Sequence, residues 1–219
     1  MAASSQPPNP TIQLPDYSIT RTHAARLGRR LEYFTIAWNS AEAIASLAAG
    51  LLAGSIALVG FGLDSVIEVS SGAVLLWRLH AESDPHRRER AEHRALRLVG
   101  VCFLALAAYV AFDAIRGLVQ REVPHPSLFG IGVAIASLIA MPLLARAKRQ
   151  VARQLNSNAM HADSRQTDFC FYLSAILLAG LVLNGLLGWW WADPVAALVM
   201  VPLIAREGVE GLRGERCCD

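Results

Sequence analysis

Long apolar segments alternate with short polar ones along most of this chain. They cover about 31–52, 56–79, 96–118, 126–147, 160–187 and 191–212. Each segment has roughly 20 residues or more, the length at which an α-helix can cross the hydrocarbon core of a bilayer. The pattern therefore predicts an all-α fold: a polytopic membrane protein in which six transmembrane helices form one bundle.

The segment before the first apolar run is polar. Four of the chain's 10 prolines lie within its first 15 residues, and it has no apolar stretch as long as the core of a signal peptide. We expect a disordered cytoplasmic tail at 1–28, a six-helix domain at 29–213 and a short cytoplasmic tail at 214–219.

Basic residues mark alternate connections between the apolar segments. They precede the first segment (Arg21, Arg26, Arg29 and Arg30), separate the second from the third (Arg78, Arg87, Arg88, Arg90, Arg94 and Arg97) and separate the fourth from the fifth (Arg146, Lys148, Arg149 and Arg153). In the other three connections Arg121 is the only arginine or lysine, and Glu122 follows it directly. The positive-inside rule then predicts six spans in the cytoplasmic (inner) membrane, with both termini in the cytoplasm.

Composition agrees with a membrane location. The chain is 54% hydrophobic and 17% charged, with a mean hydropathy of +0.37. Its net charge of +2 is too small to suggest nucleic acid as a partner, so the lipid bilayer is the expected one. The sequence also contains no Gly-rich phosphate loop, nucleophile elbow or His-Glu-x-x-His motif, and we therefore do not expect an enzyme.

Two carboxylates lie one helical turn apart inside the second apolar segment. Asp64 and Glu68 are at i and i+4, and so share one face of a helix. An ionised acid near the bilayer centre costs about 2.5–3.5 kcal/mol on insertion scales. The pair predicts a cation or proton site that faces the bundle interior. The alternative is a buried ion pair, but no basic residue is predicted at matching depth.

The fifth segment offers a second polar stripe. Asp163, Gln166 and Cys170 are at i, i+3 and i+7, and could bring a carboxylate, an amide and a thiolate to the Asp64 and Glu68 face. Such ligands suit Zn²⁺, whereas Mn²⁺ and Fe²⁺ remain open if the thiol only lines the cavity. Packing by the cysteine, a helix-to-helix hydrogen bond by the glutamine and helix capping by the aspartate are the alternatives.

Charge suggests how such a site would work. Two desolvated carboxylates cannot both ionise at low cost without a cation, so a divalent metal ion would displace their protons. Proton-coupled antiport by alternating access is the expected mechanism. Asn39 and Glu42, at i and i+3 in the first segment, line the same cavity in this interpretation. For Asn39 and Asn184 we favour helix-to-helix hydrogen bonds.

The segments 50–68 and 192–198, together with 162–164, resemble the cation diffusion facilitator (cation efflux) family, and the resemblance extends over about 31–213. It implies a six-helix transmembrane bundle that moves divalent metal ions and forms a homodimer. The family's fifth-helix His-x-x-x-Asp falls here on Gln166 and Cys170, and Glu68 stands where an aspartate is usual. The chain looks like a variant without the cytoplasmic domain that many members carry after the sixth helix.

We therefore expect a divalent metal transporter, with zinc as the first candidate and with protons as the coupled partner. The candidate metal ligands are Asp64, Glu68, Asp163, Gln166, Cys170 and Glu42, the last because its counterpart in the resembled family is also an acid. No permanently bound cofactor is expected, because the metal ion is the cargo. The alternative is a scaffold or metal-responsive partner subunit that kept the fold without transporting.

Overall fold

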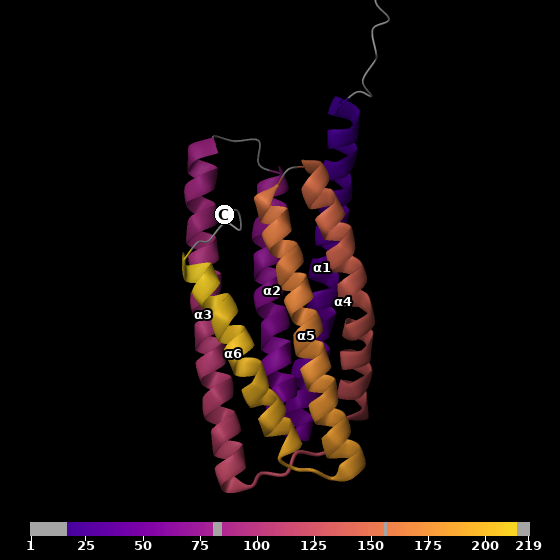
Figure 1. Cartoon of the computed structure of the whole chain (residues 1–219), viewed down its shortest axis with the longest axis vertical. Helices are drawn as coiled ribbons and strands as arrows, with labels where there is room; N and C mark the ends of the chain where they lie inside the picture. Colours follow the sequence, from indigo (N-terminus) through magenta and orange to yellow (C-terminus); the bar gives the residue numbers. More distant parts are fainter. Residues whose placement is uncertain (1–16, 81–84, 156, 214–219) are drawn as a thin grey trace, which may run out of the picture.

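The computed structural model describes residues 17–80, 85–155 and 157–213, and within these ranges the chain is a bundle of α-helices with no β-strand. The six helices are α1 (Tyr17–Ala53), α2 (Ile56–His80), α3 (Pro85–Gln120), α4 (Leu128–Leu155), α5 (Asn158–Leu187) and α6 (Ala192–Arg213). Figure 1 shows an elongated bundle of helices that run alternately up and down. The predicted all-α membrane bundle is confirmed.

Five of the helices contain stretches that are long and apolar enough to cross a membrane: His23–Ala53, Ile56–Trp77, Arg97–Gln120, Leu128–Leu155 and Asp163–Leu187. Helix α6 is also long enough, but its second half carries Arg206, Glu207, Glu210 and Arg213. It packs along α3 for much of its length. The protein is thus an integral membrane bundle whose sixth helix has a charged end.

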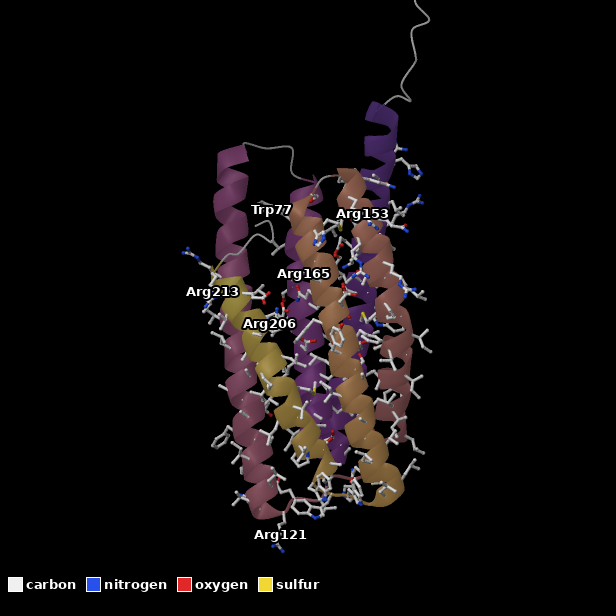
Figure 2. The ribbon with its side chains drawn as sticks, in the orientation of Figure 1. Trp77, Arg121, Arg153, Arg165, Arg206 and Arg213 are labelled. Atoms are coloured by element: carbon white, nitrogen blue, oxygen red, sulfur yellow. The ribbon has the colours of Figure 1, made fainter. Side chains whose placement is uncertain are left out.

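Basic side chains are more frequent in one half of this bundle. Figure 2 shows Arg153 near the end where α1 begins, Arg165, Arg206 and Arg213 closer to the middle, and Arg121 at the opposite end. This is the arrangement that an even number of spans with alternating loop charge requires. The assignment of the basic end to the cytoplasm remains a prediction of the positive-inside rule.

Helix α1 begins earlier than the sequence analysis expects. The predicted tail at 1–28 overlaps the helix, which starts at Tyr17; residues 1–16 and the tail at 214–219 lie outside the described part of the chain. Ala24 is fully buried, and a Cβ at Gly28 would lie 3.1 Å from Met160 Cε and 3.2 Å from Val151 Cγ1. No proline follows Pro15 in this region, so nothing stops the helix before it packs against α4 and α5.

A tight hairpin joins α1 to α2. Gly54 turns the chain in the left-handed region (φ +65°), which glycine adopts without a steric penalty. A Cβ at Gly62 would lie 3.0 Å from the Leu47 backbone nitrogen, so the absence of a side chain there lets the two helices approach closely. This close approach holds the polar face of α1 against the acidic face of α2.

The start of α2 is also tied to the start of α6. Asp193 Oδ1 accepts a hydrogen bond from Ser55 Oγ (2.5 Å), and Oδ2 accepts from the backbone N–H groups of Ile56 (2.9 Å) and Ala57 (3.4 Å). The carboxylate therefore satisfies N–H groups that the first turn of α2 leaves without a partner, and it lies where the helix dipole is positive. Asp193 is a cap supplied by a distant segment.

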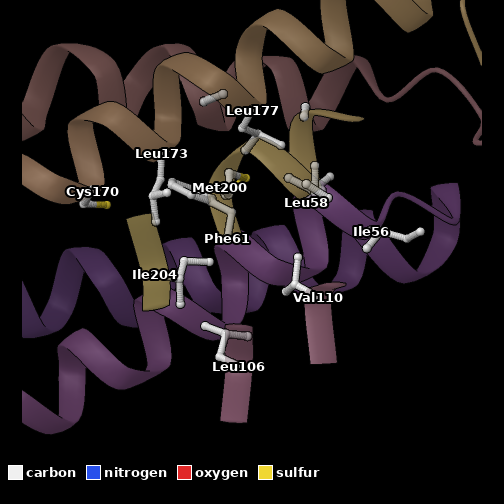
Figure 3. Close-up of a cluster of buried hydrophobic side chains, with 14 of the residues drawn as sticks. Ile56, Leu58, Phe61, Leu106, Val110, Cys170, Leu173, Leu177, Met200 and Ile204 are labelled. Carbon is white, nitrogen blue, oxygen red and sulfur yellow. The ribbon is translucent and has the colours of Figure 1, made fainter. Parts of the chain in front are cut away.

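The apolar core fills the bundle between this joint and the acidic face of α2. Its buried side chains come from all six helices and include Leu58, Phe61, Val110, Leu173, Leu177, Met200 and Ile204. Figure 3 shows them along the bundle axis, with Cys170 at one end of the cluster and Ile56 at the other. The acidic face of α2 therefore borders a closely packed apolar region.

Candidate metal site

Two carboxylates and a thiol meet in the bundle interior. Asp64 and Glu68 project from successive turns of α2, and Cys170 comes from α5; their exposed fractions are 2%, 1% and 0%. One ligand atom from each side chain lies within 4.8 Å of the others. Ligands around a tetrahedral Zn²⁺ are on the order of 3.5 Å apart, given bonds of about 2.0–2.3 Å. Small side-chain movements would let this acid–thiol cluster hold one ion.

Glu42 of α1 lies directly beside the acid–thiol cluster. Its carboxylate accepts hydrogen bonds from Ser65 Oγ of α2 (2.8 Å), Trp38 Nε1 (3.1 Å) and Ser137 Oγ of α4. Cys170 Sγ lies 3.8 Å from Glu42 Oε1. Four helices thus converge on one buried carboxylate, and the donors that hold it within the described chain are neutral.

Several polar atoms next to this cluster have no hydrogen-bond partner among the described residues. Glu68 Oε1 accepts from Thr167 Oγ1 of α5 (3.4 Å), whereas Glu68 Oε2 accepts no hydrogen bond from any described residue. Asn39 is fully buried next to Glu68, and neither of its side-chain polar atoms is hydrogen-bonded within the described chain. The contact expected for Asn39 between helices is made with Glu68 of α2, although without the geometry of a hydrogen bond. Because most buried polar groups are satisfied, these atoms are available to a ligand.

Asp163 has a different partner. Its Oδ2 lies 2.5 Å from the Nζ of Lys148, which also lies 3.4 Å from Glu32 Oε1. Lys148 and Glu32 are fully buried and come from α4 and α1. Asp163, Lys148 and Glu32 thus form a second buried group, the lysine triad, and Asp163 is not one of the three members of the acid–thiol cluster. Nor does Asp163 cap α5, because that helix begins at Asn158 and is capped by Ser157.

Lys148 is a buried residue of α4, whereas the sequence analysis counts it among loop cations and predicts no basic residue at the depth of the acids. Helix α4 continues to Leu155, and Lys148 lies on the buried face that includes Met141, Leu144 and Val151. Glu68 is within electrostatic reach of the Lys148 ammonium. The helical spacing between Lys148 and the apolar residues of this face could have identified it as buried. It was missed because every cation near the end of a span was assumed to be solvated.

A sequence model of the cation efflux transmembrane domain matches residues 33–214. The chain belongs to the cation efflux family. The matched range contains the whole acid–thiol cluster, together with Glu42, Lys148 and Asp163. Both groups of buried acids therefore lie inside the cation efflux domain, except for Glu32, one residue before the match.

Named relatives fit this membership. An uncharacterized transporter of Synechocystis is 27% identical over 180 residues, which cover 80% of this chain and 58% of that protein. Transmembrane protein 163 of Xenopus laevis is 32% identical over 133 residues, covering 61% of this chain and 47% of that protein. The cation-efflux pump FieF of Salmonella paratyphi A is 25% identical over 183 residues, covering 79% and 59%. The chain spans about half the length of these relatives.

Three other polar residues of the cation efflux domain, Gln166, Asp168 and Asn184, differ in the partners that the structure gives them. Gln166 is half-buried, and its Nε2 has no hydrogen-bond partner in the described chain. Asp168 forms an ion pair with Arg149 of α4. Asn184 Nδ2 donates to the Pro124 carbonyl (3.1 Å), so it anchors a loop and does not join two helices.

Proposed function

We propose that this protein transports a divalent metal cation across the membrane, with zinc as its preferred cargo. The observation that carries the proposal is the acid–thiol cluster: two carboxylates and a thiol, all buried, with ligand atoms within 4.8 Å of one another. A buried anionic cluster within a membrane bundle needs a cation. Membership of the cation efflux family supports a metal ion as that cation.

Zinc is favoured by the chemistry of the ligands. Carboxylate oxygen and thiolate sulfur both bind Zn²⁺, which prefers four ligands, whereas Mg²⁺ and Ca²⁺ prefer oxygen alone. Glu42 or Asn39 could supply the fourth ligand, since both lie at the edge of the cluster. The proposed ligand set is therefore Asp64, Glu68 and Cys170 with one residue of α1.

Protons are the proposed counter-ions. When the metal ion leaves, two carboxylates one turn apart repel each other, and binding a proton relieves this repulsion. Metal binding in turn releases protons, because the ligands coordinate in their deprotonated forms. Antiport of zinc against protons across the cytoplasmic membrane, with both termini inside and the chain as a homodimer, is the complete proposal.

A second candidate is a metal-responsive scaffold or partner subunit that binds zinc without moving it. The observation that favours it is the ion pair between Asp163 and Lys148, which removes an acid of the fifth helix from the metal site. The two candidates differ in one respect that can be measured. Both bind zinc, but only a transporter moves it across a sealed membrane.

The test is zinc uptake by proteoliposomes that contain the purified full chain, with a zinc-sensitive dye and a pH-sensitive dye inside. We expect zinc uptake accompanied by proton release in the opposite direction. Asp64→Asn should reduce both to the level of empty vesicles, because the cluster loses a ligand and a charge. The matched control is Asp113→Asn on α3, where the acid pairs with Arg116 (3.6 Å) away from the cluster. Zinc uptake that survives Asp64→Asn would refute the proposal.

Orientation is tested separately. In a cysteine-free background, a cysteine at Gln120 should react with an impermeant thiol reagent added outside intact cells. A cysteine at Arg153 should be protected, and both positions are exposed in the structure. The reverse labelling pattern would overturn the cytoplasmic location of the basic end.

A further inference from the structure

Lys148 is a fully buried cation within a membrane bundle. Its Nζ lies 2.5 Å from Asp163 Oδ2 and 3.4 Å from Glu32 Oε1, so one ammonium bridges α5 and α1 from α4. Glu32 is also fully buried, and its carboxylate accepts no hydrogen bond from the described residues. A buried carboxylate without hydrogen bonds depends on its counter-ion for compensation. For Glu32 that counter-ion is Lys148.

The lysine triad is electrostatically connected to the acid–thiol cluster. Glu68 is within reach of the charges of both Lys148 and Asp163. Thr167, which donates to Glu68 Oε1, also donates to the backbone carbonyl of Asp163 one turn earlier on α5 (3.2 Å). A charge change in the triad will therefore be felt at Glu68 through a low-dielectric interior.

We propose that Lys148 is a tethered counter-cation, which keeps Glu32 and Asp163 out of the metal-ligand set and weakens zinc binding at the acid–thiol cluster so that the ion can leave. This inference rests on the proposed function, because it takes that cluster to be the metal site. A lysine suits the role because its ammonium is a compact point charge on a flexible stem. Without it, Glu32 and Asp163 would join the three acids already at the site, and zinc would be held more tightly.

The first test measures zinc binding to the purified full chain in detergent by isothermal titration calorimetry. Wild type should bind one zinc ion per chain. Lys148→Met should bind its first ion about tenfold more tightly, because a nearby positive charge is removed, and should gain a second site at Glu32 and Asp163. Lys148→Arg keeps the charge and should retain wild-type stoichiometry. An isotherm of Lys148→Met that superimposes on that of wild type would overturn the inference.

Transport gives a readout that a purely structural lysine would not change. In proteoliposomes, Lys148→Met should lower the KM for zinc and lower the turnover rate together, since tighter binding slows release. Lys148→Arg should restore both values toward wild type. A variant that lowers turnover with an unchanged or higher KM would contradict the counter-cation role.

Removing the lysine alone leaves uncompensated acids, so a folding-safe variant is needed. Glu32→Gln/Lys148→Met/Asp163→Asn removes all three charges of the lysine triad as a unit, a change that buried ion pairs and triads commonly tolerate. It should bind one zinc ion within about threefold of the wild-type affinity. If Asp163 were a metal ligand, the same variant would bind zinc about tenfold or more weakly, and the inference would be wrong.

The two proposals fail in different ways. If wild type binds and transports zinc and neither lysine variant changes this, the counter-cation role of Lys148 is overturned and the proposed function stands. Wild type that binds no zinc, together with Lys148→Met that binds one ion, would contradict the proposed function while supporting the role of the lysine.

Discussion

Two groups of buried acids lie within this bundle, and they differ in how their negative charge is balanced. In the lysine triad, Glu32 and Asp163 share the ammonium of Lys148, which the chain itself supplies. In the acid–thiol cluster, Asp64 and Glu68 form no salt bridge with any described residue, and Glu42 beside them is held by hydroxyl and indole donors. The comparison teaches that burial of acids does not by itself define a metal site. What matters is whether the protein has already provided the cation.

The sharpest way to break this comparison is to give the acid–thiol cluster a cation of its own. Glu68→Lys places an ammonium one turn from Asp64, so the cluster becomes a second lysine-containing group. We expect zinc binding and zinc transport to be abolished while the protein still inserts and remains monodisperse in detergent. Calorimetry and size-exclusion chromatography measure the two outcomes. Zinc binding within about tenfold of wild type would mean that the metal site lies elsewhere.

The next largest effect concerns stability. Asp163→Asn leaves a fully buried lysine with one poorly bonded partner, so we expect it to lower the free energy of unfolding by about 3–5 kcal/mol. The control is Asp168→Asn, which breaks a pair with Arg149 that is about one-third exposed and should cost less than about 1 kcal/mol. Thermal unfolding in detergent compares them. Equal shifts for the two variants would show that burial of the triad adds nothing.

The smallest effect concerns the thiol. Cys170→Ser replaces a soft sulfur ligand with a hydroxyl, so zinc affinity should fall about tenfold while Mn²⁺ affinity changes less. Cys102→Ser on α3, where the cysteine is exposed, is the control and should bind both metals as wild type does. Competition between Zn²⁺ and Mn²⁺ in the same assay gives the ratio directly. An unchanged ratio would assign Cys170 to packing.

Much of the fold could be predicted from sequence because its main signals are local. Apolar length identified the spans, and the spacing of Asp64 and Glu68 fixed their common face on α2 without any tertiary information. The stripe predicted on α5 was right only in part, because Cys170 meets the α2 acids whereas Asp163 of the same stripe pairs with Lys148. The start of α1 was placed too late, because polar residues at 17–28 were assigned to the tail although Ala24 is buried and Gly28 packs against α4 and α5.

The rest of the site depends on contacts between helices far apart in the chain. No local sequence pattern shows that Lys148 pairs with Asp163, or that Glu32 of the first helix lies beside the same ammonium. Near the end of a span, a charged residue on the buried face has the same sequence context as one on the solvated face. The rotation of each helix decides between these outcomes, and packing sets that rotation. The triad was therefore beyond local prediction, whereas the α2 pair was not.

The cap formed by Asp193 has a mechanical consequence. Three hydrogen bonds fasten the start of α6 to the start of α2, at the end of the bundle opposite the basic residues. If α2 tilts as a rigid body, this joint acts as a pivot, and the opposite ends of α2 and α6 move the most. Those ends can therefore move apart while the three hydrogen bonds stay formed. Separating the first turns of α2 and α6 would instead break them.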